Sequence, residues 1–422
     1  MDHRCRLRDG QLVAAEGALM ARFRGQGPSA ELAPREHQLT LGERIEELAR
    51  KAEVLDPTRP AMGVLACVLA LMGLGLIIQV SHASTTVMPD AFMGEVTHLL
   101  SFRVAGVAIL LIMMRIGPAR LRPFIPFLSA LSILSLILVF LPVAGVSANG
   151  SHRWMRIPGI GLTFQPSEIA RVVIVLWVSL RCIQLGDRVR DMRSGYLPML
   201  AFGLVLSGLI LFEPDLGGAL LFIICYLCTM WVGGARPAHV AGSLGMMFLT
   251  VLGLMATILV HAQERIAVWL GNSSNAQVDR TIEAMASGDL VGVGLTHGGW
   301  RNGGLQYHQT DFVFTLFGEE LGLFGTLLIV GILLAFAWNS MRLVLSINDR
   351  FSALVAFGLL ISVALQAMLH VQIATGLAPP KGMNLPFISD GGTSLLASCL
   401  AVGLALGAAR PVESSTPYST SS

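Results

Sequence analysis

Asp311 is the carboxylate that the sequence places best for general-base chemistry. It ends a long polar segment, residues 263–311, and directly precedes an apolar run that begins at Phe312. Partial burial at such a boundary between water and lipid raises the pKa of a carboxyl toward the range that suits proton abstraction. The alternative is structural, because an acidic residue at the start of a helix is stabilised by the helix dipole.

Two arginines are candidates for binding an anionic ligand. Arg153 lies in a polar, glycine-containing segment, and Arg171 follows Pro166 and Glu168. A proline with a glutamate two residues later is typical of a helix start. Arg171 then lies one turn inside an apolar helix, where an unpaired charge costs several kcal/mol. Either these arginines contact an anion, or Arg171 forms a structural pair with Glu168.

Two further clusters carry acidic residues. Glu213 and Asp215 lie in a short polar interruption between apolar runs. We expect Asp215 to cap the helix that follows, with a divalent-cation site as the alternative. Glu319 and Glu320 lie two to three turns into the run that begins at Phe312. Acids inside a membrane are candidates for function, unless they pair with an arginine of another helix.

Residues 379–394 hold three prolines and three glycines, together with Lys381 and Ser389. This composition excludes a regular helix, and irregular backbone at membrane depth persists only where it lines a cavity or is buried in protein. The amide groups of this segment and Lys381 could hold a pyrophosphate.

The long segment 263–311 contains an amphipathic stretch, residues 277–289, with Val278, Ile282 and Met285 on one helical face. This pattern predicts a helix lying in the plane of the membrane interface. The glycines that follow do not come after a strand, so they do not indicate a nucleotide site.

The elements that position these residues must lie in lipid. Hydrophobic residues make up 54% of the 422 and charged residues only 13%, whereas a soluble protein carries about 25% charged residues. The net charge of +2 gives no indication of a nucleic-acid partner. Cys225 and Cys228 form a CxxC inside an apolar run with no second ligand pair, which indicates buried apolar side chains rather than a metal site.

Ten apolar runs approach the roughly 20 residues that cross a membrane. Because backbone groups cannot stay unpaired in lipid, we predict an all-α polytopic integral membrane protein. The transmembrane domain covers residues 61–410, between a polar N-terminal tail (1–60) and a disordered C-terminal tail (411–422). The predicted spans are residues 61–81, 102–116, 123–146, 167–186, 197–212, 216–234, 239–262, 312–338, 351–375 and 392–410.

Short loops on one side of these helices carry most of the arginines, which places that side in the cytoplasm. Both termini are therefore expected inside, and the candidate clusters lie in or beside loops that face outward. These outer loops are residues 147–166, 213–215, 263–311 and 376–391, of which 263–311, between the seventh and eighth helices, is the largest.

Taken in order, these clusters resemble the SEDS family (shape, elongation, division and sporulation) over about residues 60–410. The motifs are RW…QPSE, EPDLGG, SGDLVGVGL, TDF…GEELG and KG..LPFIS.GGTS. The GEELG motif and the Lys-Gly pair before LPFIS are more similar to the division branch of the family than to its elongation branch.

The resemblance implies a glycosyltransferase that polymerises lipid II at the outer face of the bacterial plasma membrane, at the division septum. It implies a class B penicillin-binding protein and other division proteins as partners. No tightly bound cofactor is expected, and Mg²⁺ or Mn²⁺ is the candidate metal. The family's essential aspartate corresponds to Asp311. The residues implied to bind substrate or support the cavity are Arg153, Glu168, Arg171, Asp215, Glu319, Glu320, Lys381, Ser389, Gly391 and Gly392.

The sequence departs from the family pattern at several positions. Gln309 stands where a His is usual, and the usual Leu-Pro pair is replaced by a stretch that contains Gln306 and His308. Both are candidate substrate contacts, His308 as a substitute for the missing His. Arg171 stands where a Lys is usual, and Asp390 where a Tyr is usual.

Three other functions stay open: a lipid II transporter, an elongation polymerase, and an inactive scaffold for division proteins. A transporter needs polar groups along its whole path. The motifs here crowd the outer side, which favours an enzyme.

Overall fold

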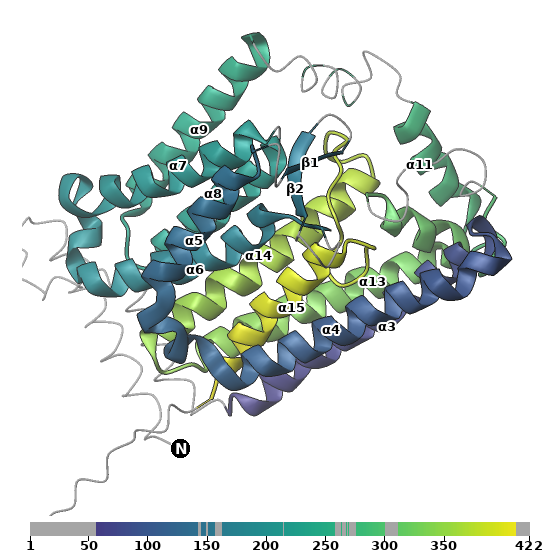
Figure 1. Ribbon diagram of the computed structural model, residues 1–422, viewed down its shortest axis with the longest axis horizontal. Helices are drawn as coiled ribbons and strands as arrows, with labels where there is room; N and C mark the ends of the chain where they lie inside the picture. Colours follow the sequence, from purple (N-terminus) through teal and green to yellow (C-terminus); the bar gives the residue numbers. More distant parts are fainter. Residues whose placement is uncertain are drawn as a thin grey trace, which may run out of the picture.

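The computed structural model describes residues 56–141, 145–148, 151–156, 163–213, 215–257, 263, 267, 269, 276–299 and 311–410. Its architecture is mostly helical (Figure 1). The long helices are α3 (Thr58–Thr86), α4 (Pro89–Leu121), α5 (Ile125–Leu138), α6 (Pro166–Leu185), α7 (Leu197–Phe212), α8 (Leu216–Val232), α9 (Pro237–Thr257), α13 (Val313–Leu345), α14 (Arg350–Ala374) and α15 (Gly392–Gly407). Each predicted apolar run overlaps one of these helices.

The helices have the length and surface of membrane spans. Six helical segments of the described chain are long and apolar enough to cross a bilayer, and α8, α9 and α15 are shorter apolar helices. Large apolar side chains such as Leu334 and Trp338 point outward, 66% and 68% exposed. Soluble proteins rarely expose apolar surface of this extent, so the chain is a multi-pass membrane protein. That ten helices span, with both termini inside, stays a prediction.

The centre of the bundle is formed by α6, α8, α14 and α15. Helices α6 and α14 bury far more of their apolar windows than α3, α4 or α13. Helices α3 and α4 run side by side along α13 and α15 (Figure 1).

The prediction of an all-α fold is wrong in one place. Strands β1 (Gly145–Ala148), β2 (Ser151–Arg156) and β3 (Thr163–Phe164) form a small antiparallel sheet in the order β1-β2-β3. The third predicted span, 123–146, is too long, because α5 ends at Leu138 and the chain reaches β1 at Gly145. Ala148 pairs with Ser151, and the two residues between them are Asn-Gly, the pair that favours a tight hairpin.

Helix α13 is broken near its start. Gly322 has φ 65° and ψ −158°, which is not helical. The segment after α11 (Ala276–Ser287) satisfies the backbone groups around the break: Val293 N–H donates to Glu319 O, and Leu323 N–H donates to Asp289 O, both at 2.9 Å. A broken helix at membrane depth persists because neighbouring protein replaces its hydrogen bonds.

Helix α11 confirms the predicted helix of the long loop, but a different face is buried. Thr281 and Ala284 are buried, while Ile282 is 48% exposed. Met285 packs against Gly318 of α13. A position in the plane of the membrane interface stays a prediction.

Candidate active site

A cluster of charges joins three elements that are far apart in the sequence. Lys381, after α14, donates a 2.7 Å hydrogen bond and ion pair to Asp215 at the start of α8. Arg153 of β2 donates through Nε to the backbone oxygen of Glu213 at 3.0 Å. The cluster therefore gathers two cationic side chains and two acidic side chains at the same end of the bundle.

Asp215 has the predicted capping role and an additional one. Its Oδ1 accepts from Gly218 N–H at 2.9 Å, which caps α8, and the same oxygen accepts from Lys381. Burial alone raises the pKa of Asp215, but the charges of Lys381 and Arg153 and these hydrogen bonds outweigh it, so that the pKa lies below its ordinary value. Asp215 is an anion that holds Lys381 in place.

Glu213 is a buried acid of different character. It is fully buried, and neither of its carboxyl oxygens has a hydrogen-bond partner among the described residues. Burial and the neighbouring charge of Asp215 raise its pKa to about 8, against the opposing effect of Arg153. Glu213 is therefore neutral at pH 7. The ammonium group of Lys381 engages Asp215, which supports the capping and pairing role of this carboxylate; a divalent-cation site at the pair stays a prediction.

Asp311 lies against the segment that carries Lys381. A Cβ added to Gly382 would lie 2.5 Å from Oδ2 of Asp311, so the carboxylate rests on the backbone of the residue after Lys381. Asp311 is partly exposed and directly precedes α13, whose N-cap is Phe312. The structure thus brings the predicted base beside the predicted cationic residue, as the sequence alone did not require.

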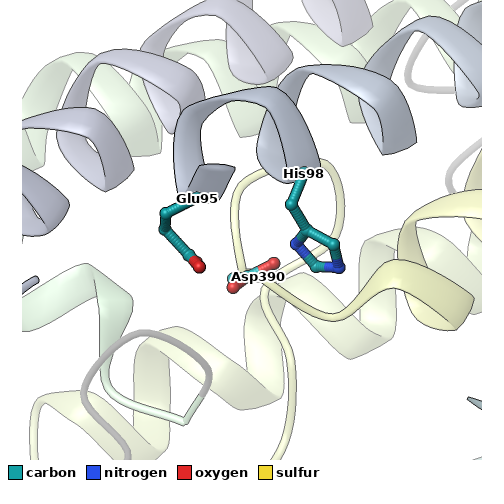
Figure 2. Close-up of side chains that lie close together, drawn as sticks. All are labelled: Glu95, His98 and Asp390. Carbon is teal, nitrogen blue, oxygen red and sulfur yellow. The ribbon is translucent and has the colours of Figure 1, made fainter. Parts of the chain in front are cut away.

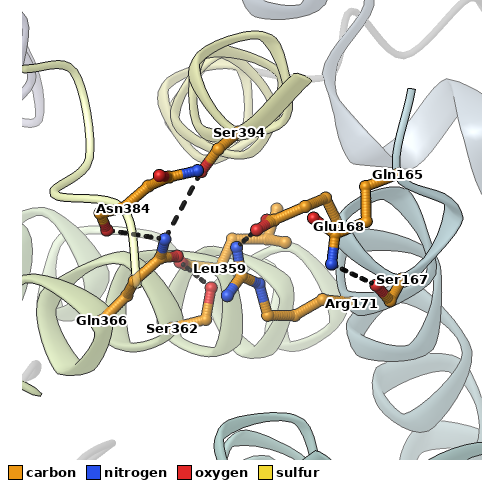
Figure 3. A network of polar contacts seen from close by, with 9 residues as sticks. All are labelled: Gln165, Ser167, Glu168, Arg171, Leu359, Ser362, Gln366, Asn384 and Ser394. Atoms are coloured by element: carbon orange, nitrogen blue, oxygen red, sulfur yellow. Dashed lines mark hydrogen bonds and ion pairs between the residues drawn. The ribbon is translucent and has the colours of Figure 1, made fainter. Parts of the chain in front are cut away.

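Polar side chains of α14 hold the irregular segment 375–391 in place. His370 Nδ1 is 2.6 Å from Met383 O. Gln366 donates to Asn384 O at 3.1 Å and to Ser394 Oγ at 3.4 Å (Figure 3). These bonds give the segment the buried surroundings that irregular backbone requires in a membrane.

Ser389, Gly391 and Gly392 serve the same segment. Ser389 is buried, and its Oγ accepts from Leu385 N–H at 2.8 Å. A Cβ at Gly391 would lie 2.4 Å from Asn384 Nδ2, and one at Gly392 would lie 2.5 Å from Cε1 of Phe102. The two glycines permit close packing, as expected for residues that support a cavity, and a substrate contact by Ser389 stays a prediction.

Arg171 forms the structural pair that the sequence left open. Its Nη2 donates to Glu168 Oε2, and both side chains are almost buried. Figure 3 shows this pair of α6 beside Gln366 and Ser362 of α14. Glu168 lies in the first turn of α6, with Pro166 at the helix start, as predicted. Anion binding by Arg171 or Arg153 stays a prediction.

Glu319 and Glu320 lie at the break of α13, where both are buried. Glu320 Oε2 accepts from Ser81 Oγ of α3 at 2.7 Å, and Ser81 Oγ accepts from Thr296 N–H at 2.8 Å. Gly298 lies against the Glu319 carboxylate, since a Cβ added to Gly298 would lie 2.8 Å from Cδ of Glu319. A serine hydroxyl is thus one hydrogen-bond partner of Glu320, and pairing of either acid with an arginine of another helix stays a prediction.

Gln306 and His308 lie outside the described residues, as does Gln309. The acid that the sequence reasoning undervalued is Glu213. Its signal was its position in a polar interruption of only three residues between two apolar runs, which leaves no room for a solvated loop.

The chain matches a family model described as "Cell cycle protein", that of FtsW, RodA and SpoVE, over residues 61–413. It is 30% identical over 350 residues to "Probable peptidoglycan glycosyltransferase FtsW" of Trichlorobacter lovleyi, covering 81% of this chain and 91% of that protein. It is 30% identical to "Stage V sporulation protein E" of Bacillus subtilis, covering 84% and 98% of the two chains.

Two solved structures have the same fold at 24% identity. A chain from work on "Structural coordination of polymerization and crosslinking by a peptidoglycan synthase complex" aligns with TM-score 0.68, over 82% of this chain and 96% of that one. The rod shape determining protein RodA of Thermus thermophilus aligns with TM-score 0.59, over 82% and 95%.

Proposed function

Because the chain belongs to the family of FtsW, RodA and SpoVE, we propose that it is a peptidoglycan glycosyltransferase that polymerises lipid II, with the division role of FtsW. The observation that carries this proposal is the contact of Asp311 with Gly382, beside the Lys381–Asp215 pair. A carboxylate that can accept a proton and an ammonium group that can balance negative charge are the two groups that sugar transfer from a pyrophosphate donor requires.

The reaction joins a pyrophosphate-activated sugar to the 4-hydroxyl of a second lipid-linked disaccharide with inversion. A single displacement suffices, so no covalent nucleophile on the protein is required. Asp311 takes the proton of the acceptor hydroxyl as the oxygen attacks. Lys381, assisted by Arg153, balances the negative charge that develops on the departing pyrophosphate, whereas Arg171 is engaged by Glu168.

Lys381 has a partner before substrate arrives. It is held by Asp215 at 2.7 Å, with its side chain 17% exposed. An anionic pyrophosphate therefore meets a cation that is already oriented, which lowers the cost of ordering it. Asp215 positions Lys381, and Glu213, being neutral, adds no second negative charge that would repel the donor.

The cellular setting follows from the same proposal. The enzyme acts at the outer face of the bacterial plasma membrane, at the septum, with both termini in the cytoplasm. A class B penicillin-binding protein cross-links the strands that it makes, and the fold shared with a chain of a peptidoglycan synthase complex supports this partner. A bound Mg²⁺ or Mn²⁺ would supply further positive charge for the departing pyrophosphate.

The test is polymerisation of purified lipid II by the detergent-solubilised full chain, with and without its transpeptidase partner. Wild type and Asp187→Asn, an exposed carboxylate on η2 (Gly186–Arg190), are expected to form glycan strands, and Asp311→Asn is not. Strand synthesis by folded Asp311→Asn refutes the assignment of the base. Absence of strands from all three, with lipid II flipping in vesicles, supports the transporter instead.

A further inference from the structure

Three potential metal ligands converge outside the site described above. Glu95 and His98 lie on α4, and Asp390 lies in the segment that leads to α15 (Figure 2). One ligand atom from each lies within 4.8 Å of the other two. Glu95 and Asp390 are partly exposed and His98 is exposed, so the cluster is not enclosed by the protein.

The spacing on α4 suits chelation. Residues three apart lie on the same face of a helix, and a Glu-x-x-His pair is the arrangement by which helical bundles bind metals through one carboxylate and one imidazole. Here the pair reads Glu95-Val96-Thr97-His98, and Asp390 adds a second carboxylate from another element.

The distances between the ligand atoms are close to those required for all three to bind one ion. Ligand atoms bind Zn²⁺ at about 2.0–2.2 Å, so two ligands of one ion lie at most about 4.4 Å apart. The upper limit of 4.8 Å in the structure exceeds this by a few tenths of an ångström, which side-chain rotation covers. One imidazole nitrogen with two carboxylates fits Zn²⁺ or Mn²⁺ better than Mg²⁺, which prefers oxygen ligands only.

We propose that Glu95, His98 and Asp390 bind a divalent transition-metal cation that fastens the outer part of α4 to the segment carrying Lys381. Asp390 stands where the family pattern given above usually has a tyrosine, and a tyrosine would supply no carboxylate ligand.

The surrounding charge permits a cation. Arg103 interacts electrostatically with Asp390, but its guanidinium donates to the backbone oxygens of Leu99 and Met72 at 3.0 and 3.3 Å. Two carboxylates against one guanidinium leave the cluster negative when His98 is neutral. The alternative without a metal is an ion pair of Asp390 with His98 or Arg103, both of which interact electrostatically with this carboxylate.

The experiment measures metal binding itself. Metal-stripped full-length protein in detergent is titrated with Mn²⁺ by electron paramagnetic resonance and with Zn²⁺ by equilibrium dialysis. Wild type is expected to bind close to one ion per chain, and His98→Gln and Asp390→Asn to bind at least about tenfold more weakly. Asp90→Asn, an exposed carboxylate in the first turn of α4, is the matched control and is expected to bind as wild type does.

Thermal unfolding supplies the second measurement. Zn²⁺ is expected to raise the melting temperature of wild type and Asp90→Asn but not of Asp390→Tyr. Equal affinity in wild type and His98→Gln, or no saturable binding by folded wild type, overturns the proposal and favours the ion pair. Neither result depends on polymerisation, so failure of this proposal leaves the proposed function untouched.

Discussion

The buried pair of Lys381 and Asp215 allows a quantitative prediction. Their side chains are 17% and 10% exposed and their charged atoms 2.7 Å apart. In Lys381→Met, Asp215 keeps its bond from Gly218 N–H but loses its principal counter-ion. Removing one partner of a buried pair costs about 3–5 kcal/mol, because an uncompensated charge remains. Residual water access and the charge of Arg153 place the expected loss at the lower end, about 3 kcal/mol.

The second variant separates stability from chemistry. In Lys381→Met/Asp215→Asn no charge is left unpaired, and replacing both partners of a buried pair is often close to neutral. The double variant is therefore expected to recover most of the lost stability. It is expected to stay inactive in polymerisation, because the cation at the pyrophosphate is still missing.

The assay is equilibrium unfolding in mixed SDS–detergent micelles for wild type, both single variants and the double variant, which together form a double-mutant cycle. A loss below about 1 kcal/mol in Lys381→Met, or a double variant no more stable than the single one, refutes the inference that the pair is buried and coupled. Recovery of polymerisation in the double variant would instead show that Lys381 acts only through Asp215.

Three further predictions concern other buried contacts. Burial raises the pKa of Glu213 to about 8 in the folded protein, from an ordinary value of 4.5. Between these two pH values the folded state keeps a proton that the unfolded chain releases. The free energy of unfolding is therefore expected to fall as pH rises from 5 to 8, by at most about 1.4 kcal/mol per pH unit. Glu213→Gln is expected to flatten that pH dependence in thermal melts, and an unchanged slope contradicts the raised pKa. Gly322→Ala is expected to destabilise by at least about 2 kcal/mol, because its φ is positive and the new Cβ would lie 2.4 Å from Gly292 N; unfolding in micelles would show it, and a neutral effect would argue against the break. Ser81→Ala is expected to cost about 1–3 kcal/mol, since Glu320 loses one hydrogen-bond donor. The control is Ser84→Ala, whose hydroxyl donates to Ser81 O in the same helix and which is expected to stay within about 0.5 kcal/mol.

Hydropathy predicted the helical segments well, because lipid forces apolar runs to be helices. Hydropathy did not predict where the helices begin and end. Helix α4 begins at Pro89, well before the predicted start at residue 102, because its first turns carry Asp90, Glu95 and His98 and do not read as apolar. For the same reason the hydropathy pattern did not place Glu95 and His98 on a helix. The strands of the sheet are too short for an alternating pattern to be recognised.

The site was predicted residue by residue but not as a set of contacts. The capping role of Asp215 follows from local sequence, whereas its pairing with Lys381, 166 residues away, has no local signal. The neutral state of Glu213 likewise depends on burial by other helices. Pairing and protonation are properties of the packed bundle, so only the fold could supply them.

The break in α13 has a mechanical consequence for Asp311. The short stretch from Val313 to Leu321 is joined to the loop around residues 288–294 by backbone hydrogen bonds that stand in for helical ones. The same loop is bonded to the other side of Gly322, where Leu323 N–H donates to Asp289 O and Phe324 N–H donates to Leu290 O, so it fixes the angle between the two parts of α13. The position of Asp311, which directly precedes the first part of α13, is therefore set in part by a loop that belongs to neither half of the helix.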